Sequence, residues 1–406
     1  MSLRTAIAFG LLCAGCGATS PANPADTSVA AADSAAGSGT DSAADSATAS
    51  STGADSAAAP GPRALSAANV VAGDPSVAPA TGGLLVAYET DGDPPPDGSR
   101  VYLTRLAASG TAGAPLAVHD GWSARIQGAG TAHRFAWIHD AGAHDELRAA
   151  EVGTGGLGAV ETLRTLGDGR LTSHAHGKAT DWLHAVCDGG AATGARLMVL
   201  AGSTAHALSD PTCGTVALVA NTQGAWLAYD APVGATAARA VMVRRLAASG
   251  APEGDALLAS PDSAKEVIDP VLAEAGADLL VLWLDAASAR LGLSRVSKGA
   301  VASMGLLELG PGPADAGALV WHDSTLWIAW HGGAEGDGAL RLGAFTVDGK
   351  SVGPPTIVTG PGSARGPVAL GGSDGVLNVL FAARDGEKQQ MMYSPHSPKD
   401  GSPLSP

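Results

Sequence analysis

The hexapeptide RLAASG occurs twice in this chain, at Arg105–Gly110 and again at Arg245–Gly250. Each copy follows a stretch of alternating character, VYLT before the first copy and VMVR before the second. Alternation with a period of two is typical of a β-strand with one buried face, and a glycine soon after it indicates a turn. We therefore interpret the two copies as the same turn in two copies of one structural repeat.

Seven strongly apolar stretches set the period of this repeat, of which LLVAYE (Leu84–Glu89) and LWIAWH (Leu326–His331) are examples. When they are superposed, one large apolar position recurs at Tyr88, Trp137, Val186, Tyr229, Trp283, Trp330 and Phe381. The mean spacing is about 49 residues, and each period has room for four strand-like stretches joined by glycine-rich turns. A repeat of four strands with this length is typical of a β-propeller blade.

The repeats predict an all-β fold, a seven-bladed β-propeller of four-stranded antiparallel blades over residues 63–393. Six or eight blades remain open if one degenerate repeat is miscounted, and the repeat around Val186 is the weakest. The last repeat lacks a fourth strand after its third, Gln389–Tyr393. Because Asn69–Ala72 resembles a fourth strand and lies before the first repeat, we expect an N-terminal strand to complete the last blade and close the ring.

The strand rhythm over about residues 64–393 resembles the sialidase-like and WD40-like propellers found in many bacterial surface lipoproteins. The resemblance lies in the order of strands and not in signature residues. The sialidase Asp-box is absent from every repeat, and so is the Gly-His and Trp-Asp punctuation of WD40 repeats. The resemblance therefore implies an architecture and no particular activity.

The first sixteen residues, MSLRTAIAFGLLCAGC, combine one basic residue with an apolar run too short to span a bilayer. This pattern is typical of a secretory signal peptide. Ala14-Gly15-Cys16 is similar to the end of the lipobox of bacterial lipoproteins, which implies lipidation at Cys16; ordinary secretion without a lipid is the alternative. In that family, Gly17 after the cysteine implies the outer membrane or cell surface of a Gram-negative bacterium.

Residues 17–62 consist almost wholly of Ala, Ser, Thr, Gly, Asp and Pro, and residues 394–406 are rich in Ser and Pro. Such segments cannot bury enough apolar surface to offset the entropy of ordering. The sequence thus predicts a disordered linker at 17–62 and a disordered tail at 394–406. The linker would tether the propeller to the membrane.

Charge restricts the classes of partner. The chain has 24 Lys and Arg against 39 Asp and Glu, a formal net charge of −15. Such a surface repels nucleic acids, so we expect no nucleic-acid partner and favour an envelope protein, a peptide or a glycan. We expect the protein to be a monomer.

Two cysteines lie in the predicted propeller, Cys187 and Cys213, both in the repeat around Val186. In a four-stranded meander their positions share one face, and an exported compartment permits oxidation. The sequence therefore favours a disulfide over two free thiols.

Acidic residues gather in the turns between the second and third strands of the repeats, which share one face of a propeller. We take Asp93, His139, Asp140, Asp230, Asp285 and His331 as candidate ligand-binding residues on this face. The alternative is that Asp occupies turns for local hydrogen-bonding reasons. His174 and His176, two apart on a first strand, are candidate channel-lining residues.

No cofactor and no metal site are predicted. Asp91, Asp93 and Asp97 hint at a structural calcium ion, but Pro95 stands where an EF-hand needs Asp or Asn. The sequence contains neither His-Glu-x-x-His nor a P-loop, and we assign no catalytic residue. The leading hypothesis is a lipid-anchored binding or scaffolding module of the cell envelope, without enzymatic activity. The alternative is a hydrolase or lyase that acts on glycans or peptides at the acidic face.

Overall fold

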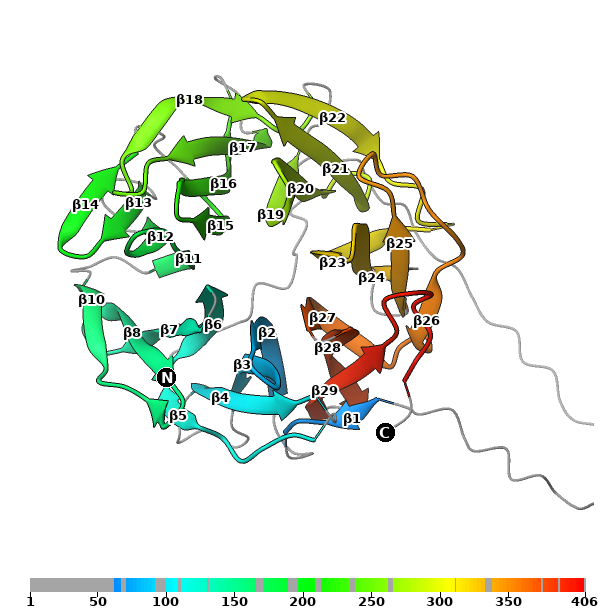
Figure 1. Cartoon of the computed structure of the whole chain (residues 1–406), viewed down its shortest axis with the longest axis horizontal. Helices are drawn as coiled ribbons and strands as arrows, with labels where there is room; N and C mark the ends of the chain where they lie inside the picture. The colour runs from blue at the N-terminus through cyan, green and yellow to red at the C-terminus, as the bar shows by residue number, and fades with distance from the viewer. Residues whose placement is uncertain are drawn as a thin grey trace, which may run out of the picture. The chain divides into compact units, whose positions relative to one another are not determined.

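The computed structural model describes residues 62–66, 71–91, 99–108, 111–129, 131–165, 171–188, 196–208, 213–233, 238–261, 266–310, 312–332, 338–373, 375–385 and 388–404. Over these ranges the chain forms seven antiparallel sheets arranged around a ring (Figure 1). No helix in these ranges is long and apolar enough to cross a membrane. The prediction of an all-β, seven-bladed propeller is confirmed.

Each blade is a meander whose first strand lies nearest the centre of the ring and whose last strand lies at its edge (Figure 1). Blade 1 contains β2 (Val71–Ala80), β3 (Gly83–Asp91), β4 (Ser99–Ala107) and β5 (Ala117–Asp120). Blade 2 contains β6 (Trp122–Ala129), β7 (Ala132–Asp140), β8 (Asp145–Gly153) and β10 (Glu161–Thr165), with β9 (Gly156–Leu157) also paired to β8. Blade 3 contains β11 (Leu171–Lys178), β12 (Trp182–Asp188), β13 (Arg196–Ala201) and β14 (Thr204–Ala207).

The remaining blades follow the same order. Blade 4 contains β15 (Val216–Asn221), β16 (Gly224–Pro232), β17 (Arg239–Leu246) and β18 (Pro252–Leu258). Blade 5 contains β19 (Val267–Ala275), β20 (Asp278–Asp285), β21 (Arg290–Ser297) and β22 (Ala300–Leu306). Blade 6 contains β23 (Ala314–His322), β24 (Thr325–Gly332), β25 (Ala339–Phe345) and β26 (Thr356–Thr359). Blade 7 contains β27 (Ala364–Ser373), β28 (Val376–Asp385), β29 (Lys388–His396) and β1 (Arg63–Ala64).

The described parts of the two RLAASG copies lie at equivalent positions, as predicted. The first copy begins in β4 and precedes β5, and the second begins in β17 and precedes β18. Ala107 N donates to the carbonyl of Thr111 at 2.9 Å, and Ala247 N donates to that of Ala251 at 2.8 Å. Equal hydrogen bonds at equal positions show that identical sequence specifies one turn in blades 1 and 4.

The core consists of apolar clusters between neighbouring blades. The recurring apolar position of each second strand is buried and faces the preceding blade. Trp283 of blade 5 packs with Val241 and Val243 of blade 4, and Trp330 of blade 6 packs with Leu282 of blade 5. Burying each such side chain contributes about 1.5–3 kcal/mol, so the layers between blades hold the ring together.

The ring is closed by an N-terminal strand, as predicted, but the strand lies earlier than predicted. In β1, Arg63 and Ala64 pair with Tyr393 and Met392 of β29. Val71 and Ala72 instead begin β2 and pair with β3 of blade 1. The assignment of Asn69–Ala72 as the closing strand is therefore wrong, because an apolar run without alternation does not distinguish a first strand from a fourth.

The ordered fold extends past Tyr393, where the prediction ended it. Strand β29 continues to His396, and the side chains of Ser394 and His396 are buried. His396 Nδ1 lies 2.9 Å from the carbonyl oxygen of Gly401, and Leu404 N donates to Pro395 at 2.9 Å. The prediction of a disordered tail from 394 is wrong for residues 394–404, because pairing with β28 supplies contacts that Ser- and Pro-rich composition does not indicate.

Candidate functional site

The described candidate residues lie at the ends of second strands, next to the turns that lead to third strands. His139 and Asp140 end β7, Asp230 and Asp285 lie near or at the ends of β16 and β20, and His331 lies near the end of β24. Cys16 and Asp93 lie outside the described residues. The five described candidates are spread over blades 2, 4, 5 and 6.

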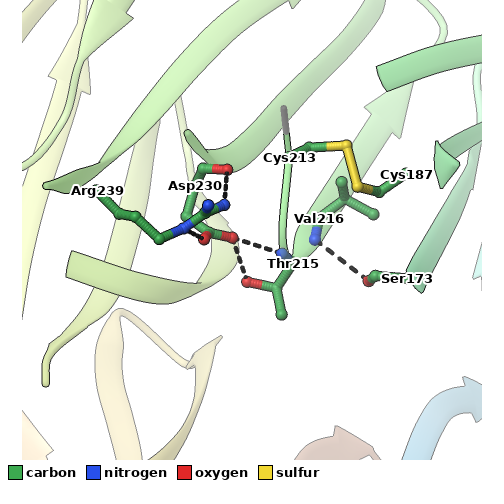
Figure 2. The surroundings of a disulfide bond; sticks show 7 residues. All are labelled: Ser173, Cys187, Cys213, Thr215, Val216, Asp230 and Arg239. Carbon is green, nitrogen blue, oxygen red and sulfur yellow. Dashed lines mark hydrogen bonds and ion pairs between the residues drawn. A yellow bond between two sulfur atoms is a disulfide. The ribbon is translucent and has the colours of Figure 1, made fainter. Parts of the chain in front are cut away.

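Asp230 is a structural residue that ties three strands of blade 4 together (Figure 2). Its carboxylate is 2% exposed and accepts hydrogen bonds from Thr215 N at 2.5 Å, Thr215 Oγ1 at 2.7 Å and Arg239 Nε at 2.5 Å. Arg239 also donates to the Asp230 carbonyl at 2.8 Å. A buried carboxylate with this many donors is already satisfied by the protein and is poorly placed to bind a ligand.

The other candidates hold turns or link blades. Asp285 accepts hydrogen bonds from Ala287 N at 3.1 Å and Ser288 Oγ at 2.8 Å. Asp140 accepts one from Gly142 N at 2.8 Å, which is the local bonding expected of Asp in turns. His139 Nδ1 lies 3.2 Å from the carbonyl oxygen of Asp120 in blade 1.

His331 makes a corresponding link on the other side of the ring. Its Nε2 lies 3.2 Å from the carbonyl oxygen of Gly366 in blade 7. His331 thus connects blade 6 to the following blade, whereas His139 connects blade 2 to the preceding one.

His174 and His176 do not line the channel, and that prediction is wrong. Both rings are buried between blades 2 and 3. His174 Nε2 lies 2.6 Å from the carbonyl oxygen of Ser123, and His176 Nε2 lies 2.8 Å from that of Arg134. The two-residue spacing does put them on one face of the strand, but in a propeller that face packs on the neighbouring blade.

The disulfide between Cys187 and Cys213 is confirmed, with Cα atoms 5.8 Å apart. It links β12 to the segment just before β15 and thus connects blade 3 with the start of blade 4 (Figure 2). The backbone N of Val216, three residues further on, donates to Ser173 Oγ of β11 at 3.3 Å. Blades 3 and 4 are therefore held by a covalent bond and a hydrogen bond at the same junction.

A polar cluster between blades 1 and 2 includes residues that the sequence did not single out. Glu146 accepts a hydrogen bond from Arg148 Nε at 2.8 Å and lies 3.4 Å from His144 Nε2. The hydrogen bond from Arg148 lowers the pKa of Glu146. The ring of His119 stacks on Trp137 at 4.6 Å, and burial lowers the His119 pKa.

In sequence, the only signal for this cluster was the two-residue spacing of Glu146 and Arg148, which places both on one face of β8. Arg148 and Glu146 form an ion pair, so the charge of each side chain is neutralised by the other. Among the described residues, no group of His, Cys, Asp or Glu is placed to hold a metal ion.

One stretch has the spacing of a catalytic serine motif but not its structure. In GGSDG (residues 371–375), Gly371–Ser373 end β27, and Ser373 pairs with Val376 of the next strand, β28. A nucleophile elbow instead joins a strand to a helix. His322 of blade 6 packs beside Gly372 and lies 3.5 Å from Asp323. Within the described part of the chain no hydrogen bond links His322 to Ser373, so this geometry does not activate the serine.

A pocket of about 260 Å³ lies beside β25 of blade 6. Two segments form its walls: one leads from blade 5 to blade 6, and the other leads from β25 to β26. Two aromatic rings and a guanidinium group also line it. The lining residues are Glu308, Leu309, Gly310, Trp330, Arg341, Gly343, Phe345, Ser351, Gly353 and Pro355. Trp330 Nε1 and Arg341 Nε are both buried, and neither has a hydrogen-bond partner among the described residues.

The fold and these sites define the class of protein as a seven-bladed β-propeller whose conspicuous charged residues mostly stabilise the blades. No family model matches the chain, and no curated protein matches it. Solved structures with the same fold include an α-L-arabinofuranosidase from Fusarium graminearum in complex with an iminosugar inhibitor. It superposes with a TM-score of 0.52 at 10% identity, over 82% of this chain and 94% of that chain.

A prolyl endopeptidase superposes with a TM-score of 0.50 at 16% identity, over 84% of this chain and 48% of that chain. The chain thus spans about half the length of that enzyme. The β-propeller domain of the Trilobed protease from Pyrococcus furiosus gives a TM-score of 0.46 at 12% identity, over 79% and 97% of the two chains. At these identities the likeness shows the fold alone.

Proposed function

We propose that this protein is an exported binding module of the cell envelope, anchored by a lipid on Cys16 and tethered by residues 17–62. Both the anchor and the tether lie outside the described residues. As a coil, the tether would reach about 35–40 Å. The Cys187–Cys213 disulfide supports export, because disulfides form and persist in oxidising compartments.

The observation that carries the binding role is the pocket beside β25. Its lining includes the charged side chain of Arg341 and the aromatic rings of Trp330 and Phe345. Of the pocket-lining residues, only Glu308 could act as a base, and it is exposed. A cationic and aromatic lining whose one acid is exposed favours binding over turnover. The candidate ligand-binding acids Asp140, Asp230 and Asp285 accept hydrogen bonds within turns and between strands.

Two experiments test the proposal. Substitution Cys16→Ala should move the protein from the membrane fraction to the soluble fraction, and mass spectrometry of the wild-type N-terminal peptide should find a lipid. If the wild-type protein and the Cys16→Ala variant were both found in the soluble fraction, the lipid anchor would be ruled out.

The binding role is tested with the purified propeller against glycan and peptide libraries, in capture and turnover assays. Capture without turnover is the expected result. The hydrolase alternative would be supported if the wild type cleaved any substrate and variants of Arg341 kept that activity.

A further inference from the structure

We propose that a second pocket, at the junction of blades 7 and 1, binds a small carboxylate group that accepts a hydrogen bond from Asn378 and lies beside Arg63. This site is separate from the pocket beside β25 and goes beyond the proposed function. The observation behind it is one residue position that recurs in every blade and is occupied differently in blade 7.

The third residue before the recurring apolar position of each second strand faces the following blade. In five blades it is Leu or Trp, and it packs in the apolar layer between the two blades. In blade 2 it is Arg134, which forms an ion pair with Glu161. In blade 7 it is Asn378. The apolar residues at this position are Leu85, Leu183, Trp226, Leu280 and Trp327.

Asn378 lies in the core without the hydrogen bonds that a core amide normally makes. The residue is 6% exposed, and its side chain has no hydrogen-bond partner among the described residues. Its cross-strand neighbours are Gly371 and Pro395, neither of which carries a polar side chain. Because buried polar side chains are normally hydrogen-bonded, this amide has both a donor and an acceptor to offer to a partner from solution.

Asn378 lines a cavity of about 60 Å³, together with Leu84 and Leu106 of blade 1. Neither amide atom of Asn378 is among the side-chain atoms that are sealed from solvent without a partner, so the amide reaches solvent through the cavity that it lines. One water molecule needs about 10–15 Å³ of such space. The cavity therefore admits a group larger than a single water, such as a carboxylate with a methyl group.

The composition of the lining favours an anion. Arg63 of β1 lines the cavity, and no Asp or Glu is among the described residues that do so. The chain as a whole has a net charge of −15, so the sign of the charge is reversed at this place. Ser373 adds a hydroxyl group to the lining. A guanidinium, an amide N–H and a hydroxyl can all donate to the two oxygens of a carboxylate, whereas a cation would be repelled by Arg63.

The cavity also brings together the two ends of the described chain. Arg63 belongs to β1, and Leu404 follows β29, which lies beside β1 in blade 7 (Figure 1). Leu404 N donates to the carbonyl of Pro395 at 2.9 Å, and both residues line the cavity. A ligand in the cavity would contact both ends and blade 1, so its binding should stabilise the closed ring.

Acetate is the probe, and the readout is the side-chain NH₂ signals of Asn378 in proton–nitrogen correlation spectra of the full chain. Substitution Asn378→Leu identifies these signals by removing them. Acetate should move them until they saturate, and neutral acetamide or chloride at the same concentration should not. The side-chain amide of Asn221, which donates to Glu274 at 2.7 Å, should stay in place and serves as the control.

Three variants separate binding from folding. Arg63→Met should weaken acetate binding by about tenfold or more, as expected for loss of a charged hydrogen bond. Arg244→Met, which removes the same charge in blade 4, should leave the binding unchanged. Asn378→Leu supplies the residue type of the other blades, so it should melt at or above the wild-type temperature. Acetate should raise the melting temperature of the wild type more than that of Asn378→Leu, which reports the general effect of the salt.

A free organic acid and the C-terminus of a peptide share this carboxylate chemistry, and a second titration distinguishes them. The ligands are N-acetyl-dialanine and the same dipeptide with an amidated end. A peptide is the natural source if the free-acid dipeptide moves the Asn378 signals at a lower concentration than acetate does and the amidated one does not. A small organic acid is the source if acetate alone moves them.

The proposal is overturned if acetate leaves the Asn378 signals unmoved, if acetamide moves them equally, or if Arg63→Met binds acetate as tightly as the wild type. A cross-relaxation signal from water to the Asn378 amide that acetate does not displace would show a hydration site only and would also overturn it. These readouts involve neither Cys16 nor the pocket beside β25, so failure here is distinguishable from failure of the proposed function.

Discussion

His176 and His184 stack face to face inside the protein, with ring centroids 5.2 Å apart, at the junction of blades 2 and 3. The two residues are directly opposite each other in the β11–β12 ladder. His174 Nδ1, His176 Nδ1 and both ring nitrogens of His184 are buried, and none has a hydrogen-bond partner among the described residues. The apolar cluster at this junction contains Val186 with Ile138, Leu147 and Leu200, and it is the smallest cluster among the described residues.

This stack predicts that the protein loses stability in mild acid. Burial is the main cause that lowers the pKa of His174 to about 3, that of His176 to about 4, and that of His184 well below 6.5. The unfolded chain binds protons near pH 6.5, whereas the folded chain does not until about pH 4 or below. As far as these histidines are concerned, the free energy of unfolding should therefore be highest above pH 7 and should fall as the pH drops through 6.5. The fall should be up to about 1.4 kcal/mol per pH unit for each histidine.

Substitution His184→Leu tests this origin, measured by urea unfolding at pH 7 and pH 5. The variant should lose less stability between the two pH values, by about 2 kcal/mol, because one fewer buried histidine is protonated on unfolding. It should also be no less stable than wild type at pH 7, since two unpartnered polar atoms are removed. An unchanged difference between pH 7 and pH 5 would show that other groups govern the acid sensitivity.

Substitution Asp230→Asn should destabilise the propeller by about 2–3 kcal/mol, because Arg239 would lose its charged partner. The value lies below that of a fully buried pair, since the Arg239 side chain is 24% exposed. The matched control is Asp285→Asn, which alters only bonds within a turn and should cost about 1 kcal/mol or less. A stable Asp230→Asn protein that fails to capture its ligand would instead make Asp230 a binding residue.

The sequence was sufficient to predict the fold because a propeller repeats one local pattern. One apolar position recurs about every 49 residues and is buried between neighbouring blades. It is occupied by Tyr88, Trp137, Val186, Tyr229, Trp283, Trp330 and Phe381. Period-two alternation places a side chain on one face of its strand, but it does not say which neighbour covers that face. His174 and His176 were placed on a shared face and wrongly assigned to the channel for this reason.

The candidate sites were less predictable because they depend on pairing across strands. Arg341 lies opposite Trp330 only through the β24–β25 register, which the sequence does not show. Asp230 carries no sign in sequence of its bonds to Thr215 and Arg239. Composition likewise could not show that the Ser- and Pro-rich end pairs with β28.

The strand that closes the ring should be required for stability. Leu65 N donates to the carbonyl of Met391 at 2.7 Å, and Met391 N donates to Ser66 Oγ at 3.0 Å. Ser66→Ala would leave a buried backbone N–H unpaired and should cost about 1–2 kcal/mol. Removal of residues 1–66 should lower the melting temperature further than removal of residues 1–61, which leaves β1 intact. Equal melting temperatures for the two truncations would show that β1 does not hold the ring.

The Cys187–Cys213 disulfide should stabilise blade 3, the blade that also carries the buried histidines. On the chain-entropy estimate, a bond across 26 residues stabilises by about 3.5 kcal/mol, since it restricts the unfolded chain. Cys213 also precedes Thr215 and Val216, which bond to Asp230 and to Ser173. Reduction or the double substitution Cys187→Ala and Cys213→Ala should therefore lower the free energy of unfolding by about that amount. Hydrogen exchange should show that amides of β11, β12 and β15 lose protection first, while β20 and β24 stay protected. A uniform loss over all blades would mean that the bond acts only on the unfolded chain and does not reinforce blade 3.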